Sequence, residues 1–180
     1  HVEGIMQKIF TPTDLKAKEI CKLDSLLAEM RLYKDEYELE ILSEVADISS
    51  LAHINAMRRC KPGMFEYEIE ALLLEGFVSQ GCRSVAYESI VAAGKNACTL
   101  HYIANKAKLN STDLLLVDAG AELNCYASDI TRTYPIGGKF SPEQKAIYEL
   151  VLLAQHKIIA AIKPGVTWDE LSNIAALEIT

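Results

Sequence analysis

The chain has 180 residues, half of them hydrophobic, with 18 basic and 25 acidic side chains and a net charge of −7. A chain of this length can bury a full hydrophobic core, which excludes a mini-protein that depends on disulfides or metals for its stability. The acidic balance, without a basic stripe, argues against nucleic acid and against an anionic membrane surface as partners. We therefore expect an ordinary soluble globular domain.

The cysteines favour a reducing compartment. They are odd in number and widely scattered, and none forms a C-x-x-C pair: Cys21, Cys60, Cys82, Cys98 and Cys125. No apolar stretch approaches the roughly 20 residues that span a bilayer, and the N-terminal residues do not resemble a signal peptide. We expect a cytoplasmic protein with free thiols and no membrane partner.

Residues 1–27 are mixed in composition and are expected to form a linker or the tail of a preceding N-terminal domain. Within them, the turn residues 11–14 predict the start of a short helix that runs through Leu23. The chain begins at His1 and stops at Thr180 within a helical pattern. We expect it to be a fragment.

The patterning then changes from helices to strands. With Asp35 as N-cap, apolar residues recur every three or four positions to Cys60, and a second helix follows Lys61-Pro62-Gly63 and ends at Gly81. Beyond it, β-branched, aromatic or continuous apolar runs predict strands at 85–87, 89–93, 99–102, 114–117 and 126–133.

The end of the chain repeats the order of its beginning. Ser141-Pro142-Glu143 predicts the N-terminus of a helix that runs to about Ile162, and Lys163-Pro164-Gly165 separates it from a last helix capped by Thr167. Because Lys61-Pro62-Gly63 has the same helical context, we interpret this order as an internal duplication with an unfinished second unit. The alternative is that proline and glycine simply end both helices.

Two carboxylates flank one predicted hairpin. An apolar strand ends in Asp118, and the next strand begins at Asp129. A hairpin centred on Leu123-Asn124 would place them directly opposite, where like charges repel. A divalent cation such as Mn²⁺ or Mg²⁺ would turn that repulsion into a ligand set. Alternatively, Asp118 is a turn residue and Asp129 a solvated strand end.

Other polar residues in the predicted strands are less specific. His101 ends an apolar run that would point its imidazole into a cleft, although a lone strand histidine is more often structural. For Tyr87 the pattern favours a half-buried core tyrosine. His53 and His156 lie in predicted helices and are expected at the surface or in packing. Motifs of serine hydrolases, helical zinc proteases and phosphate-binding loops are absent from the sequence.

Several motifs, in this order and spacing, give the sequence a family resemblance. Residues 87–102, then Val117-Asp118-Ala119-Gly120, then Ser128-Asp129-Ile130-Thr131-Arg132-Thr133, resemble the catalytic domain of Xaa-Pro aminopeptidase (aminopeptidase P) and its relative prolidase. The resemblance covers about residues 28–180. It implies the α+β pita-bread fold, internally duplicated, of which residues 28–180 would be the first half and the start of a truncated second half.

The same resemblance implies roles for individual residues. The family has a site for two divalent metal ions, usually Mn²⁺, in which the residue matching Asp118 binds one ion and the residue matching Asp129 bridges both. A histidine matching His101 contacts the substrate carbonyl, and a tyrosine matching Tyr87 lies beside the metals. The remaining ligands, one histidine and two glutamates, come from the second half of the fold and have no match in this chain.

The activity implied is metal-dependent release of the N-terminal residue from peptides with proline in second position, with the fragment itself inactive. We also expect a homo-oligomer. Prolidase remains the near alternative. A pita-bread binding module without catalysis and a metal-free creatinase-like hydrolase are disfavoured by Asp118 and Asp129, and methionine aminopeptidase by the residues after Asp129.

Overall fold

The structure, a computed structural model, describes residues 23–180, so the short helix expected from residue 11 lies mostly outside the described residues. The chain divides into two compact units, one ending at Leu39 and the other beginning at Glu40. The first contains helix α2 (Leu23–Leu32), which the sequence analysis did not predict and which begins within the expected linker. In the described part of the chain, no helix has the length and apolar character required to span a membrane.

Two helices precede the sheets, as predicted. Helix α3 (Glu36–Arg59) starts at Asp35, whose carboxylate accepts from the Glu38 N–H (2.8 Å) while Glu38 accepts in return from the Asp35 N–H (2.8 Å). This reciprocal pair is a capping box. Helix α4 (Glu66–Ser79) begins after a turn in which Gly63 has a φ of +94°, a value that favours glycine.

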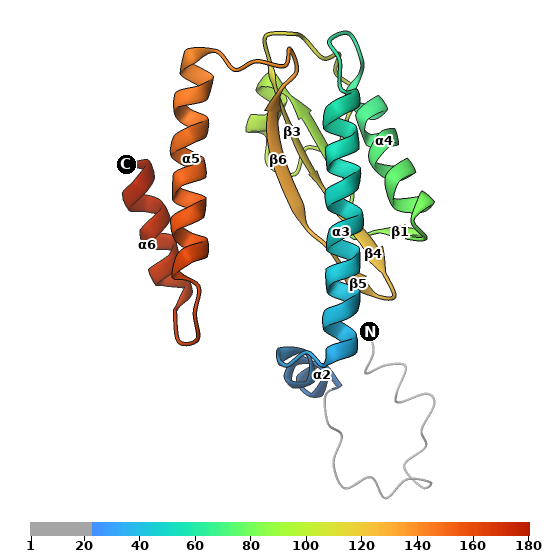
Figure 1. The fold of residues 1–180 in the computed structure, drawn as a ribbon, viewed down its shortest axis with the longest axis vertical. Coiled ribbons are helices and arrows are strands. Elements are labelled where there is room, and N and C mark those ends of the chain that lie inside the picture. Colours follow the sequence, from blue (N-terminus) through green and yellow to red (C-terminus); the bar gives the residue numbers. More distant parts are fainter. Residues whose placement is uncertain (1–22) are drawn as a thin grey trace, which may run out of the picture. The chain divides into compact units, whose positions relative to one another are not determined.

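The strands form two small antiparallel sheets (Figure 1). One has the order β1–β4–β5 and the other β2–β3–β6, with β3 in the centre. The strand bounds are Ser84–Val85 for β1, Ile90–Ala93 for β2, Leu114–Ala119 for β3, Ala121–Leu123 for β4, Tyr126–Ala127 for β5 and Ile130–Pro135 for β6.

The expected hairpin exists, but its register differs by two residues from the prediction. Asp118 pairs with Thr131, not with Asp129, because the turn is centred on Asn124-Cys125 rather than on Leu123-Asn124. Both turn residues have positive φ (50° and 69°), as in a type I′ hairpin turn. A two-residue shift preserves the alternation of faces, so Asp118 and Asp129 remain on the same face of the hairpin.

Three strand predictions are wrong in detail. The expected strand at 99–102 is a turn that follows a 3₁₀ helix (Gly94–Cys98). The expected strand at 85–87 is only the two-residue β1, and Tyr87 lies in a bend. The long strand at 126–133 is broken at Ser128-Asp129, so that β5 and β6 belong to different sheets.

The core lies where α3 and α4 pack against the strands, and Figure 1 shows both helices beside them. Each element contributes apolar side chains at its own period, every third or fourth residue on the helices and every second on β3. Large, fully buried side chains among these are Val45, Ile69, Leu73, Phe77, Val91, Leu115 and Val117.

Helices α5 (Pro142–Ala161) and α6 (Trp168–Ile179) pack against each other (Figure 1). The turn between them matches the turn between α3 and α4. Gly165 has a φ of +93°, close to that of Gly63. The Glu170 side chain accepts from the Thr167 N–H (2.7 Å), and the Glu68 side chain accepts from the Phe65 N–H in the same way (2.7 Å). The local geometry supports the interpretation of these two segments as copies of one unit.

Candidate metal centre

Three of the four predicted site residues meet at one point. The hydroxyl of Tyr87 donates to Asp118 Oδ1 at 2.5 Å and lies 3.0 Å from Asp129 Oδ1. Asp118 comes from the end of β3, Asp129 from the break before β6, and Tyr87 from the bend after β1. The carboxylates therefore share one site even though they are not directly opposite each other in the hairpin.

The electrostatics of this site favour added positive charge. In the described part of the chain, neither Asp118 nor Asp129 has an ion pair. Partial burial, followed by the hydrogen bond to Asp118, raises the pKa of the Tyr87 hydroxyl, which therefore remains a proton donor between the two acids. Two carboxylates converging without an ion-pair partner fit the donor preference of a divalent cation.

The carboxylates alone do not complete such a site. Among the described residues, no group of three or more His, Cys, Asp or Glu side chains has the geometry to hold a metal ion. Asp118 and Asp129 would therefore be a partial ligand set, and further donors would have to come from elsewhere.

Polar side chains of α3 hold the backbone beside the two carboxylates. The Nε2–H of buried His53 donates to the carbonyl oxygen of Ala119, next to Asp118 (2.9 Å). Burial lowers the pKa of His53, which keeps its imidazole neutral. One turn earlier, the Ser49 hydroxyl lies 2.6 Å from that of Ser128, next to Asp129.

These supporting residues were missed by the sequence analysis, which expected His53 at the surface or in packing. The signal available was weak, because Ser49 and His53 occupy the apolar positions of an amphipathic helix. A polar residue at a core position requires a buried partner, which here lies at least 66 positions away in the sequence.

His101, the fourth predicted residue, lies on the loop after the 3₁₀ helix. It is exposed and has a φ of +54°, and within the described residues it makes no hydrogen bond or ion pair to Tyr87, Asp118 or Asp129. Its loop is anchored to the core through Tyr102 and Asn105.

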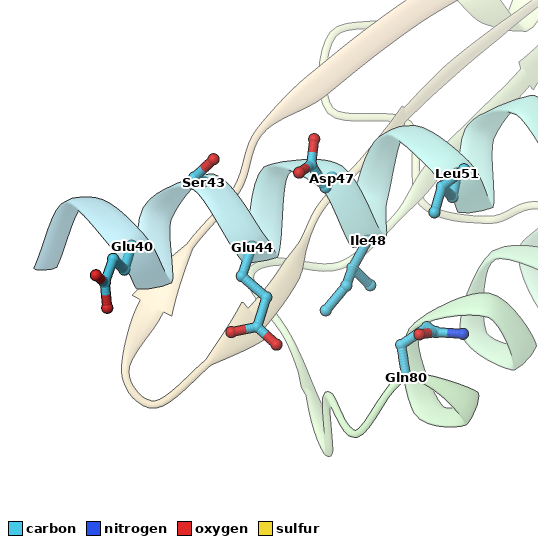
Figure 2. A pocket seen from close by; sticks show the side chains of 7 residues that line it. All are labelled: Glu40, Ser43, Glu44, Asp47, Ile48, Leu51 and Gln80. Atoms are coloured by element: carbon cyan, nitrogen blue, oxygen red, sulfur yellow. The ribbon is translucent and has the colours of Figure 1, made fainter. Parts of the chain in front are cut away.

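A surface depression lies along α3, lined by residues that include Glu44, Asp47 and Gln80 (Figure 2). None of the four predicted site residues lines it. It is therefore distinct from the paired carboxylates.

Comparison with known proteins identifies relatives. A probable Xaa-Pro aminopeptidase of Podospora anserina is 48% identical over 158 residues, which cover 88% of this chain and 34% of the relative. Among solved structures, aminopeptidase PepP of Pseudomonas aeruginosa superposes with a TM-score of 0.85 at 52% identity, covering 87% of this chain and 36% of that chain. A Zn-substituted Escherichia coli aminopeptidase P in complex with product gives a TM-score of 0.83 at 38% identity over 85% of this chain and 35% of that chain.

The chain thus spans about a third of the length of these relatives. Its fold is the pita-bread fold of aminopeptidase P, present in part, which confirms the fold class expected from the sequence. Residues 40–180 match metallopeptidase family M24, and the chain belongs to that family.

Proposed function

We propose that this chain is part of the catalytic domain of a metal-dependent Xaa-Pro aminopeptidase, which releases the N-terminal residue from peptides with proline in second position. The observation that carries the proposal is the convergence of Asp118, Asp129 and Tyr87 in an M24 chain whose similar relatives bear that name. In this proposal, residues 28–180 form the first half and the start of the second half of the domain, and residues 1–27 are the preceding linker or tail.

Asp118 would bind one of two divalent ions, Mn²⁺ in our proposal, and Asp129 would bridge both. Metal ions at such a site supply Lewis acidity, which polarises a carbonyl and lowers the pKa of water. Tyr87 holds its proton between the two carboxylates and would fix their orientation. His101, exposed on its loop, would donate to the carbonyl oxygen of the residue before proline.

The proposed substrate follows from the chemistry of the bond. The amide before proline has no N–H, so a peptidase cannot recognise the scissile amide by accepting its hydrogen bond. Recognition must then come from the carbonyl side, where His101 would act, and from contacts to the proline ring.

The test is hydrolysis by the complete protein that carries these residues. With Mn²⁺ it should cleave Xaa-Pro-Yaa tripeptides, and a chelator should abolish the activity. Preference for the dipeptide Xaa-Pro would instead identify a prolidase, and binding without cleavage would identify a non-catalytic module.

One substitution tests the metal role of the carboxylates. Asp129→Asn keeps the size of the side chain and removes one charge, and it should lower kcat by roughly 1,000-fold or more. The matched control is Asp47→Asn, which makes the same chemical change in the depression of Figure 2 and should leave kcat unchanged. An Asp129→Asn enzyme with a near-normal rate would refute the bridging role.

We also propose a cytoplasmic location and a homo-oligomer. Free thiols at the described cysteines support a reducing compartment. Large apolar side chains left exposed on α5 and α6 support association between copies of the 180-residue chain, among them Ile147, Ile159, Trp168 and Leu177. Sedimentation velocity on the 180-residue chain checks the second proposal, and a monomer at every concentration would contradict it.

A further inference from the structure

One buried carboxylate outside the paired acids gathers four hydrogen bonds. Glu66, at the start of α4, is fully buried. Its Oε1 accepts from the Ala93 N–H (2.8 Å) and from Asn96 Nδ2 (2.9 Å), and its Oε2 accepts from the Tyr102 hydroxyl (2.8 Å) and from the Ala107 N–H (2.8 Å). These four donors match the roughly four acceptor positions of a carboxylate.

All four donors belong to one segment, residues 93–107, and this is the segment that carries His101. After the 3₁₀ helix, residues 99–107 contain no strand or helix, so no regular backbone ladder fixes their path. His101 is exposed and directly precedes Tyr102, one of the four donors. The carboxylate of Glu66 thus joins the start of the segment, its end and the residue next to the histidine.

A second buried anchor acts at the same loop. The side chain of Asn105 accepts from the Val91 N–H (3.0 Å) and donates to the carbonyl oxygen of Ser89 (2.8 Å). The loop backbone is held in strained conformations at His101 and Asn105, with φ values of 54° and 44°. Conformations of this kind persist only where the surroundings fix them.

The chemistry at Glu66 requires a carboxylate and not an amide. Glutamine has only one acceptor oxygen, and its NH₂ group would face two donors, one of which, the Ala107 N–H, has no acceptor capacity. In a buried position an unpaired N–H is costly, so the loop would move to find another partner.

We infer that Glu66 is a positioning residue that fixes the His101 loop relative to Asp118 and Asp129, an inference that rests on the proposed function. By fixing the loop, Glu66 would hold the imidazole of His101 within reach of the substrate carbonyl oxygen. Glu66 itself touches no reacting atom. Its effect on the rate therefore passes through His101.

The test uses Glu66→Gln in the complete protein, with Glu68→Gln as the matched control. Glu68 lies on the same turn of α4 and accepts a single bond, from the Phe65 N–H, which a glutamine oxygen can also accept. We expect Glu66→Gln to lower kcat by roughly 10- to 100-fold, since a displacement of about 1 Å in a catalytic group can have an effect of that size. KM and the affinity for Mn²⁺ should change less than about threefold, and Glu68→Gln should alter none of these.

A double-mutant cycle separates positioning from general damage to the fold. In a His101→Ala background, Glu66→Gln should lower kcat by less than about twofold, because the group that it positions is already absent. If the fold-losses in kcat of Glu66→Gln and His101→Ala multiply in the double variant, or if Mn²⁺ affinity falls with kcat, Glu66 is merely structural and the inference is wrong. If Glu66→Gln does not fold, Tyr102→Phe replaces it in the cycle, because this variant removes one of the four donors to Glu66. Tyr102→Phe should show the same coupling to His101→Ala at smaller amplitude. Additive losses in that cycle would equally overturn the inference.

Hydrogen exchange gives a readout that does not depend on the peptidase activity. Glu66→Gln should speed exchange at the amides of Ala93 and Ala107 and across residues 99–107 by about 10-fold or more, while β3 and β6 keep their protection. Unchanged exchange in the loop would refute the anchoring. Faster exchange in a protein that cleaves no Xaa-Pro peptide would instead show that the proposed function has failed while the anchoring is real.

Discussion

The hydroxyl oxygens of Ser49 and Ser128 lie 2.6 Å apart, although 79 positions of the sequence separate the two residues. The Ala121 N–H contacts both hydroxyls, at 3.1 Å and 3.0 Å, and the Ser128 hydroxyl donates to the Ala121 carbonyl oxygen (3.1 Å). Helix α3 is thereby joined to Ala121 on β4 and to the hydroxyl of Ser128, which lies at the break in the opposite strand of the hairpin. Asp129 directly follows Ser128, so this network fixes the position of one of the paired carboxylates.

Ser49→Ala should therefore destabilise the protein, because the Ser49 side chain is buried within this network. The buried Ser128 and Ala121 groups keep each other as partners, so we expect a loss of about 1–2 kcal/mol in the free energy of unfolding. The control is Ser50→Ala. Ser50 is the exposed neighbour of Ser49 on α3, and the same serine-to-alanine change there gives the same gain in helix propensity. Urea denaturation checks the difference, and equal stabilities for the two variants would show that the hydroxyl pair contributes nothing.

Gly120→Ala should have a larger effect at the same place. A Cβ on Gly120 would lie 1.8 Å from the carbonyl oxygen of Ser128, a backbone atom that cannot move without displacing Asp129. We expect a loss of more than about 3 kcal/mol, or failure to fold.

Gly138→Ala serves as the comparison for this substitution. Gly138 has a φ of +79° but open space around it, so an added Cβ there introduces backbone strain alone, about 1–2 kcal/mol. Thermal unfolding of the two variants checks the order of these effects. A Gly120→Ala protein as stable as Gly138→Ala would contradict the close approach at Ser128.

Local signals in the sequence were sufficient to predict helices α3 to α6. The capping carboxylate of Asp35 and the Pro-Gly turns act over four or five residues, and their predictions are confirmed. The hairpin turn was misplaced because a type I′ turn needs two residues with positive φ, and cysteine at position 125 is not one of the residues that favour it.

Contacts between distant residues explain the remaining differences. Residues 99–102 have strand-like composition, but the hydrogen bond from Tyr102 to buried Glu66 draws this segment into a loop. Asp118 and Asp129 both lie at the Tyr87 hydroxyl despite the misplaced turn, because alternation of faces survives a register error of two residues. Ser49, His53 and Glu66 gave no comparable signal, since the partners of a buried polar residue are known only from the fold.

The thiols should differ in reactivity according to their burial. Burial raises the pKa of Cys60 to about 11, so at pH 8 only roughly one molecule in a thousand would carry the reactive thiolate. Exposed Cys98 and Cys125 should react with iodoacetamide first, and labelling of Cys60 should rise with pH up to about 11. Peptide mapping by mass spectrometry resolves each site, and rapid labelling of Cys60 at pH 8 would contradict its burial.

The 180-residue chain alone should bind Mn²⁺ weakly. Asp118 and Asp129 supply carboxylate oxygens at one site, but the described residues offer no third histidine, cysteine or carboxylate ligand beside them. With so few ligands the dissociation constant should exceed about 0.1 mM by calorimetry, and Asp118→Asn should weaken the residual binding further. The complete protein should bind at least about 100-fold more tightly, because the missing ligands would then be present. Tight, stoichiometric Mn²⁺ binding by the 180-residue chain, retained in Asp118→Asn, would place the metal site away from the paired carboxylates and refute their assignment.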